Sequence, residues 1–192
     1  MKKTSVSKNI LILLAALLMA GCAGNTGAKS AAGPDRAIES ALDHLTRGKD
    51  LYVEEKNEQA IEEFSRAIAL DKELIEAYLF RGAAYGNIGD FDRAIADFSE
   101  AIRLDPNDAS AYHSRGVAYS VKAEWDRAIA DFSEAVRIYP DNAVDYHNRG
   151  VAYSAKGEWD RAIADFEASL RIDPNQANTR QKLEEAMQEH GR

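Results

Sequence analysis

Residues 109–142 read ASAYHSRGVAYSVKAEWDRAIADFSEAVRIYPDN, and residues 143–176 repeat them as AVDYHNRGVAYSAKGEWDRAIADFEASLRIDPNQ. The two stretches are identical at 22 of their 34 positions. A fixed period of this length is typical of stacked, identical supersecondary units. Such stacks generally provide surfaces that bind other molecules rather than pockets for catalysis.

The same 34-residue frame extends towards the N-terminus, clearly over residues 75–108 and more weakly over residues 41–74. Within each unit, small and apolar residues recur at helical spacing. In the third unit they form two stripes, which consist of Tyr112, Gly116 and Tyr119, and of Ala128, Phe132 and Ala135. The sequence therefore predicts four units, at 41–74, 75–108, 109–142 and 143–176, with two amphipathic helices in each.

Glycine and proline mark the ends of these predicted helices. Gly89 and Gly157 follow the first helix of their units, where a left-handed residue is least costly as glycine. Prolines 106, 140 and 174 close three of the units, because a helix tends to end just before a proline. Glu55 and Ala123 replace the glycine in the other two units, so we expect their turns to be more strained or differently closed. Lys72 replaces the first proline.

These motifs resemble the tetratricopeptide repeat (TPR), a 34-residue helix-turn-helix with an aromatic residue, glycine and tyrosine on its first helix. Its second helix carries alanine, an aromatic residue, alanine and proline, as in Ala128, Phe132, Ala135 and Pro140. The resemblance covers residues 41–176 and implies an all-α fold, a right-handed α-solenoid of four units. Residues 177–192 are expected to form a C-terminal capping helix, with a dimer contact as its alternative role.

The N-terminus predicts a signal peptide. Lys2, Lys3 and Lys8 precede an apolar run over residues 10–21 that is too short to span a bilayer. The run ends in Leu-Met-Ala-Gly-Cys at residues 18–22, which resembles the bacterial lipoprotein signal (lipobox). That resemblance implies cleavage after residue 21 and lipid (palmitate) attachment at Cys22. The alternative is an ordinary signal peptide that happens to end near a cysteine.

The predicted domains are a signal peptide at 1–21, a lipidated flexible tether at 22–33 and a lead-in helix at 34–40 that merges with the first repeat helix. The resemblance implies a bacterial cell-envelope location. In enteric-type bacteria, Ala23 rather than aspartate after the cysteine favours the outer membrane, facing the periplasm. Loss of the leader's three lysines takes the formal net charge from -8 to -11. A domain this acidic is a poor candidate for binding nucleic acid.

The sequence shows no motif for catalysis, a cofactor or a metal. It has no glycine-rich phosphate loop, no H-E-x-x-H and no G-x-S-x-G, and Cys22 is its only cysteine. His113 and His147 occupy the same place in adjacent units, which suggests a metal or pH-sensing ladder. Stacked helices are roughly 8–10 Å apart, too far for two equivalent residues to share one metal ion. We therefore interpret both as partner-facing polar residues.

An arginine precedes the glycine position in every unit, and an acid follows each arginine sixteen residues later. An arginine this close to the core needs a partner for its charge. We therefore predict ion pairs between the two helices of each unit, and the alternative is an arginine ladder that grips a ligand's carboxylates. The predicted pairs are Arg47–Glu63, Arg81–Asp97, Arg115–Asp131 and Arg149–Asp165.

In the family that the chain resembles, the first helices line a concave binding groove. The corresponding exposed places form a mildly apolar trough that lacks the lysine and asparagine set of chaperone-binding members. An extended segment or a helix of a partner protein is the expected guest. The groove residues predicted here are Leu45, Lys49, Tyr52, Leu79, Ala83, Asn87, His113, Val117, Ser120, His147, Val151 and Ser154.

The predicted function is a non-enzymatic scaffold or adaptor, lipid-anchored in the envelope, that binds protein or peptide partners in this groove. Lipoproteins of this kind serve as adaptors for cell-wall enzymes or as assembly factors for pili and secretion channels. The alternative is a structural homo-oligomer, such as a homodimer, that self-associates through its terminal helix.

Overall fold

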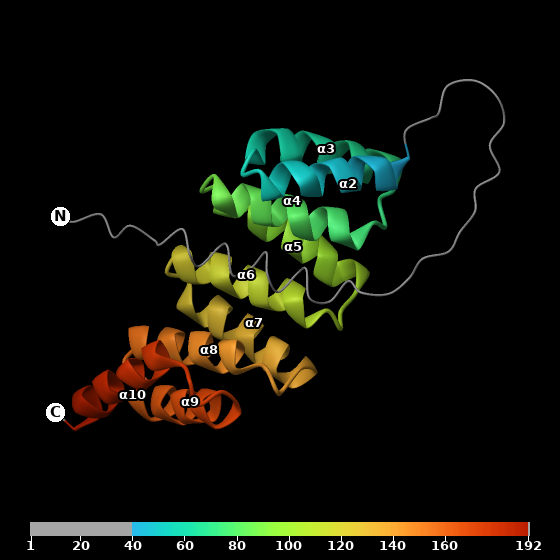
Figure 1. Ribbon diagram of the computed structural model, residues 1–192. Helices are drawn as coiled ribbons and strands as arrows, with labels where there is room; N and C mark the ends of the chain where they lie inside the picture. The colour runs from blue at the N-terminus through green and yellow to red at the C-terminus, as the bar shows by residue number, and fades with distance from the viewer. Residues whose placement is uncertain (1–39, 192) are drawn as a thin grey trace, which may run out of the picture. The chain divides into compact units, whose positions relative to one another are not determined.

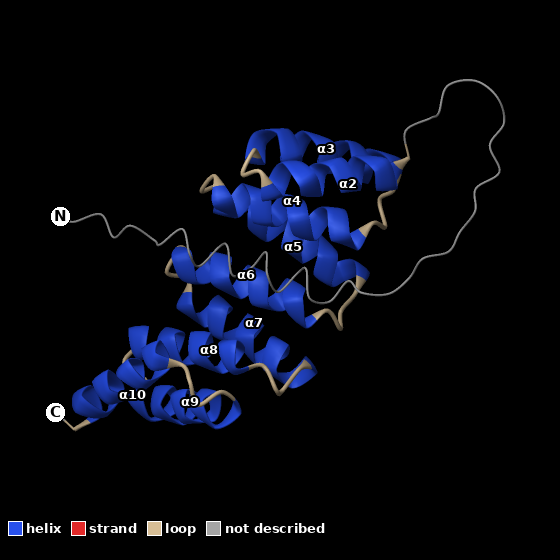
Figure 2. Cartoon of the chain, in the orientation of Figure 1, coloured by secondary structure: helices blue, strands red, loops and turns tan. Residues whose placement is uncertain are grey.

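The computed structural model describes residues 40–191, and in this range it is built from helices without strands (Figures 1 and 2). The all-α TPR fold predicted from the sequence is confirmed. The helices are α2 (Ala41–Val53), α3 (Asn57–Leu70), α4 (Ile75–Asn87), α5 (Phe91–Leu104), α6 (Ala109–Val121), α7 (Trp125–Ile138), α8 (Ala143–Ala155), α9 (Trp159–Ile172) and α10 (Ala177–His190).

The described residues divide into two compact units, residues 40–90 and 91–191. In the first unit, α3 packs against both α2 and α4. In the second unit, α5 to α10 pack successively, each helix against the next. The first helices α2, α4, α6 and α8 begin at the residues where the four predicted repeats begin, and α10 begins 34 residues after α8.

The hairpins α2–α3, α6–α7 and α8–α9 each close around a contact between a glycine and a phenylalanine. A Cβ atom added to Gly116 would lie 2.8 Å from the Phe132 ring, and one added to Gly150 would lie 2.8 Å from the Phe166 ring. No real Cβ contact is this short, so a larger residue would force the two helices apart. Phe132 and Phe166 are almost completely buried, as expected for core residues.

The first repeat helix begins at Ala41, and this corrects one expectation. Ser40 has an extended backbone and caps α2: its side chain accepts a hydrogen bond from the Asp43 amide, and the Asp43 carboxylate accepts one from the Ser40 amide. This capping box fixes the start of α2 directly after Ser40. The predicted merger of the lead-in helix with α2 is therefore wrong. The predicted signal peptide, Cys22, the tether and residues 34–39 lie outside the described residues.

The turns between paired helices all use a left-handed residue, whether or not it is glycine. Gly89 and Gly157 have φ values of 83° and 74°, and Glu55 and Ala123 both have φ of 58°. Of the two outcomes expected for Glu55 and Ala123, the strained turn is therefore correct. No helix in the described range has the length and apolar character that crossing a membrane requires.

Replacing Ala123 by glycine is expected to raise the free energy of unfolding by about 0.5–1 kcal/mol. The change removes left-handed strain of about 1–2 kcal/mol, which the greater freedom of glycine in the unfolded chain partly offsets. Urea unfolding of Ala123→Gly and of the matched control Gly157→Ala measures this, and Gly157→Ala should be destabilised. A destabilised Ala123→Gly would contradict the assignment of strain to this turn.

Candidate protein-binding surface

An arginine recurs at the same position of each repeat, and in the third and fourth repeats it links neighbouring helices of the stack. Arg115 Nε and Nη2 donate to the two oxygens of Asp131, both at 2.8 Å, and Arg149 makes the same two bonds to Asp165, also at 2.8 Å. Both carboxylates are buried, and the bonds to them raise the pKa values of both arginines above the usual range. The predicted pairing across the two helices is confirmed at these arginines.

The same arginines also reach the preceding repeat, which the sequence analysis did not predict. Arg115 Nη1 donates to Ser99 Oγ at 3.0 Å, and Arg149 Nη1 donates to Ser133 Oγ at 3.2 Å. Arg81 donates to Ser65 in the same way, at 3.0 Å. Each serine precedes its arginine by sixteen residues, and this spacing in the sequence is the signal that could have revealed the contact.

Tyrosines flank these arginines on their own helices. The Arg115 guanidinium lies 5.8 Å from the ring centroid of Tyr112 and 6.0 Å from that of Tyr119. Arg149 lies 5.5 Å from the Tyr146 ring. Cation–π attraction adds to the bidentate ion pair, so the guanidinium is fixed on several sides. The alternative, an arginine ladder that grips a ligand, does not fit these enclosed groups.

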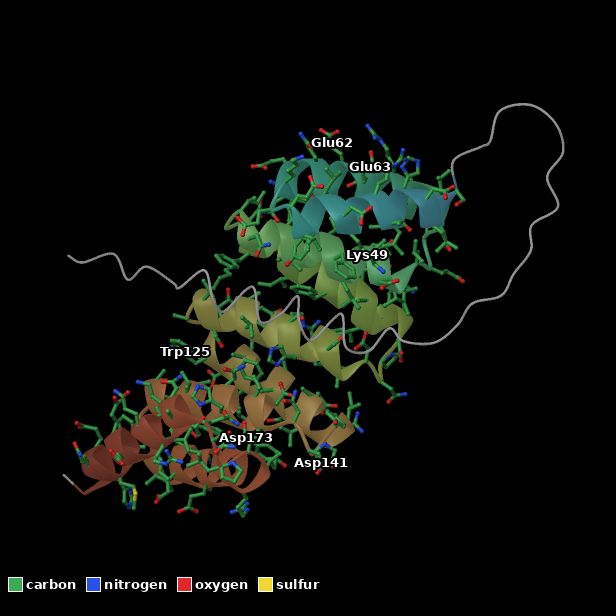
Figure 3. All side chains as sticks on the ribbon, viewed as in Figure 1. Lys49, Glu62, Glu63, Trp125, Asp141 and Asp173 are labelled. Atoms are coloured by element: carbon green, nitrogen blue, oxygen red, sulfur yellow. The ribbon has the colours of Figure 1, made fainter. Side chains whose placement is uncertain are left out.

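In the first repeat, different residues surround the corresponding arginine and carboxylate. His44 stands where the other repeats have tyrosine, and its Nδ1 lies 2.8 Å from Glu63 Oε2. Arg47 Nε also reaches Glu63, at 3.2 Å, and Arg66 bonds the second oxygen of this carboxylate. The predicted Arg47–Glu63 pair is therefore confirmed. Figure 3 shows Glu63 beside the exposed Glu62 on α3.

His113 bonds a residue of the next repeat. Its Nδ1 lies 2.5 Å from Asp145 Oδ1, and the side chains of His113 and Asp145 are 7% and 1% exposed. Asn142 donates to the other Asp145 oxygen at 2.7 Å, and the His113 ring packs edge-on against Phe132 at 6.0 Å. The interpretation of His113 as a partner-facing residue is wrong, because stacking of the next repeat buries its side chain.

His147 makes the corresponding contact with α10. Its Nδ1 lies 2.8 Å from Thr179 Oγ1, and its ring lies 5.8 Å from the Phe166 ring. Burial lowers the pKa of His147, and the positive charge of Lys182 lowers it further. His147 therefore helps to attach α10 to the fourth repeat rather than lying free in a groove.

Comparison with known proteins agrees with this geometry. Residues 48–89 and 87–120 match the family described as TPR repeat, and residues 143–176 match the one described as Tetratricopeptide repeat. The chain carries tetratricopeptide repeats. No curated protein matches the chain in sequence.

Solved structures with similar folds include two crystal structures of MamA. One has a TM-score of 0.76 and 25% identity and aligns over 80% of this chain and 84% of its own. Another has a TM-score of 0.70 and 26% identity, over 88% and 89%. The second TPR domain of human RPAP3, in complex with an HSP70 peptide, has a TM-score of 0.56 and 24% identity, over 57% and 92%.

Half of the predicted groove residues are buried in the TPR stack, which contradicts their expected exposure. His113 is the fifth residue of its helix, and its side chain points towards Asp145 of the next repeat, so stacking of the two repeats buries it. Similar burial affects residues one turn later. The buried members of the predicted set are Leu45, Tyr52, Leu79, Ala83, His113 and Val117.

The other predicted residues are partly or fully accessible, but several are engaged. Lys49 pairs with Glu76 and lies 5.0 Å from the Phe80 ring centroid, so it reaches across to α4 (Figure 3). Asn87 is exposed and donates to Asn57 at 3.1 Å. Ser120 and Ser154 are half-buried, as are His147 and Val151, and Val151 packs against the core around Phe166.

Two apolar residues on α2 are exposed, and Leu42 was not among the predicted groove residues. Leu42 is 62% exposed and Val53 is 63% exposed. They lie eleven residues apart with Lys49 between them, and this spacing places all three on one face of the helix. Ile88, 41% exposed, follows Asn87 at the end of α4. The first unit therefore exposes apolar side chains along its first helices.

The described residues contain no assembled metal site. In residues 40–191, no three histidine, cysteine or acidic side chains come close enough to hold a metal ion. Within the same range, every buried polar side-chain atom has a hydrogen-bond partner. A surface hollow at the α6–α7 turn is crossed by ion pairs of Lys156 with Asp126 and Glu158, and its lining consists of Ala123, Glu124, Trp125, Asp126, Arg127 and Lys156.

Replacing Asp131 by asparagine is expected to lower the free energy of unfolding by about 2–4 kcal/mol, because it leaves the partly buried Arg115 without its counter-charge. The matched control is Asp126→Asn, whose carboxylate is 84% exposed and pairs with Lys156. It should cost less than about 1 kcal/mol. Chemical denaturation measures both, and equal costs would contradict the structural role of the buried pair.

The lowered pKa of His147 makes α10 docking sensitive to acid. In the unfolded chain histidine titrates near its usual pKa of about 6.5, so the unfolded state binds the proton first as pH falls. Stability is therefore complete above this pKa and is lost as pH drops towards the lower folded-state pKa. Unfolding free energies measured from pH 7 to pH 5 should fall less in His147→Leu than in the original chain. Identical slopes would show that His147 does not titrate as described.

Proposed function

We propose that this protein is a non-enzymatic scaffold that binds segments of other proteins along the exposed face of α2 and α4. The observation that carries this proposal is the pair of accessible apolar residues, Leu42 and Val53, on one face of α2. Exposed apolar side chains that share a helix face mark interaction surfaces more often than scattered ones do. The second TPR domain of human RPAP3, which has a similar fold, was solved in complex with an HSP70 peptide.

The chemistry of this face favours an uncharged or mildly apolar guest. On this face of α2, Lys49 lies between Leu42 and Val53, and its charge is paired with that of Glu76. The amide of Asn87 can donate to a backbone carbonyl and accept from a backbone amide. An amphipathic helix or an extended segment with apolar anchors fits these groups, since both present apolar side chains at regular intervals.

The proposal includes a lipid anchor at Cys22 in a bacterial envelope, facing the periplasm. It is supported by the charged and apolar layout of residues 1–21 and by the absence of any second cysteine in the sequence. Attached acyl chains contribute about 0.8 kcal/mol per buried methylene group, so several chains hold a protein stably on a membrane. An adaptor for cell-wall enzymes and an assembly factor for pili or secretion channels both fit this arrangement.

Replacing Leu42 and Val53 by glutamate is expected to reduce partner capture at least about tenfold, because charges at an apolar contact disrupt its desolvated centre. Photo-crosslinking in the native envelope, with the probe at position 42 or 53, should give a discrete crosslinked protein. The matched control carries the probe at Leu70, which is 56% exposed on α3. The same crosslinks at position 70, or none at 42 and 53, would contradict the proposed surface.

Replacing Cys22 by serine tests the anchor separately. The variant should leave the membrane fraction or remain unprocessed, because serine cannot carry the thioether-linked lipid. Fractionation followed by mass spectrometry of the N-terminal peptide measures both outcomes. Unchanged membrane association of Cys22→Ser would show that the anchor lies elsewhere.

A further inference from the structure

The fourth repeat carries, beneath α10, a second version of the surface that the third repeat presents to α8. The polar contacts of the third repeat with α8 are His113–Asp145, Ser133–Arg149 and Asp126–Lys156. At the places of His113, Ser133 and Asp126, the fourth repeat has His147, Glu167 and Asp160. Ala152 of α8 is fully buried, and Ala186 at the same place of α10 is 1% exposed and packs with Phe166. Helix α10 therefore lies on the fourth repeat in the register that α8 has on the third.

Helix α10 satisfies only part of this surface. The hydroxyl of Thr179 lies 2.8 Å from His147 Nδ1, at a place where the third repeat has an ion pair. His190 Nε2 lies 3.4 Å from Asp160 Oδ1, whereas the corresponding lysine–aspartate contact of α8 is 2.6 Å long. The side chains of His190 and Asp160 are 50% and 86% exposed, so solvent screens their attraction. Two of the three polar contacts are therefore weaker on α10 than on α8.

The third contact is missing on α10. Glu167 is exposed and replaces Ser133, the residue that accepts a hydrogen bond from Arg149. The place of Arg149 on α10 is taken by Leu183, which packs on the core around Phe166 and cannot pair with a carboxylate. An arginine at this place would meet an opposite charge instead of a hydroxyl, and two opposite charges attract more strongly. Glu167 therefore favours an arginine-bearing helix.

The attachment of α10 is also less extensive than that of α8. The buried residues of α10 are Thr179 and Ala186, and those of α8 are Ala143, Asp145, Gly150 and Ala152. At the start of α8, the Asn142 side chain accepts a hydrogen bond from the Val144 amide, whereas the Gln176 side chain forms no such cap on α10. Elements with few buried contacts open locally at a smaller cost in free energy. Another helix can therefore compete with α10 for this surface.

We propose that the surface beneath α10, with His147, Asp160 and Glu167 around Phe166, binds a helix of a partner protein that displaces α10. The partner helix carries an acid, an arginine, an alanine and a lysine at spacings of four, three and four residues, as α8 does. Its arginine pairs with Glu167, its acid with His147 and its lysine with Asp160. Charge complementarity selects this helix, because α10 has none of the three charged residues at these places. The surface is separate from the one proposed on α2 and α4.

The probe for this surface is a fluorescent peptide with the sequence of residues 142–156 and the change Gly150→Ala, which favours the helix. Fluorescence anisotropy measures its affinity for the chain that begins at residue 22 with Cys22→Ser. Ala186→Asp places a charge in the buried contact of α10 and should raise the peptide affinity at least about tenfold, because the surface becomes accessible. The matched control is Met187→Asp, at a side chain that is 55% exposed on the same helix, and it should leave the affinity unchanged.

An exchange of charges identifies the contact within the complex. On the Ala186→Asp chain, a peptide with Arg149→Glu should bind at least about tenfold more weakly than the first peptide. Adding Glu167→Arg to that chain should restore most of the loss, because the two charges are then opposite again. If circular dichroism shows that Ala186→Asp loses more helix than α10 contains, Leu183→Ala takes its place, since it weakens the apolar contact of α10 without adding a charge.

Three results would overturn the proposal. The first is equal peptide affinity for the original, Ala186→Asp and Met187→Asp chains, and the second is the absence of rescue by Glu167→Arg. The third is dimer formation by the Ala186→Asp chain in sedimentation without peptide, because a second copy would then cover the surface. Leu42→Glu combined with Val53→Glu should not change the peptide affinity, so the proposed function on α2 is tested independently.

Discussion

The bridging arginine is the interaction on which the repeat structure depends. In the third and fourth repeats, the guanidinium of Arg115 or Arg149 links the two helices of its own repeat through a buried carboxylate. The same group contacts the preceding repeat through a serine hydroxyl. Each repeat buries too little apolar surface to be stable alone, so contacts between neighbours supply much of its stability. A planar group with five donors suits this task, because it satisfies partners in two directions at once.

This arrangement also determines where binding can occur. Arginines and histidines are the residues that would first be suspected of binding a ligand, yet Arg115, Arg149 and His113 are committed to contacts inside the stack. The side chains that remain accessible include the apolar residues Leu42 and Val53 on α2. A scaffold whose charged groups hold the repeats together can vary these exposed residues at little cost to stability, since they make few structural contacts.

The sequence predicted the features that follow from periodicity. Helix boundaries and the pairing of Arg115 with Asp131 both repeat at a constant spacing, so pattern alone identifies them. It failed where a neighbouring repeat decides the outcome. His113 was placed in the groove because its partner lies on the next repeat: Asp145 replaces the alanine of the two preceding repeats, and the sequence analysis did not connect this change with His113. Exposure of Leu42 likewise depends on three-dimensional packing.

The most direct test is a double-mutant cycle between Arg149 and Ser133, which belong to different repeats. Unfolding free energies of Arg149→Leu, Ser133→Ala and the combined variant give the coupling between the two side chains. A bridging arginine predicts a favourable coupling of about 1 kcal/mol, the usual contribution of a hydrogen bond to a charged donor in a partly accessible site. Strictly additive effects would contradict the account, because Arg149 would then hold no contact across the repeat boundary.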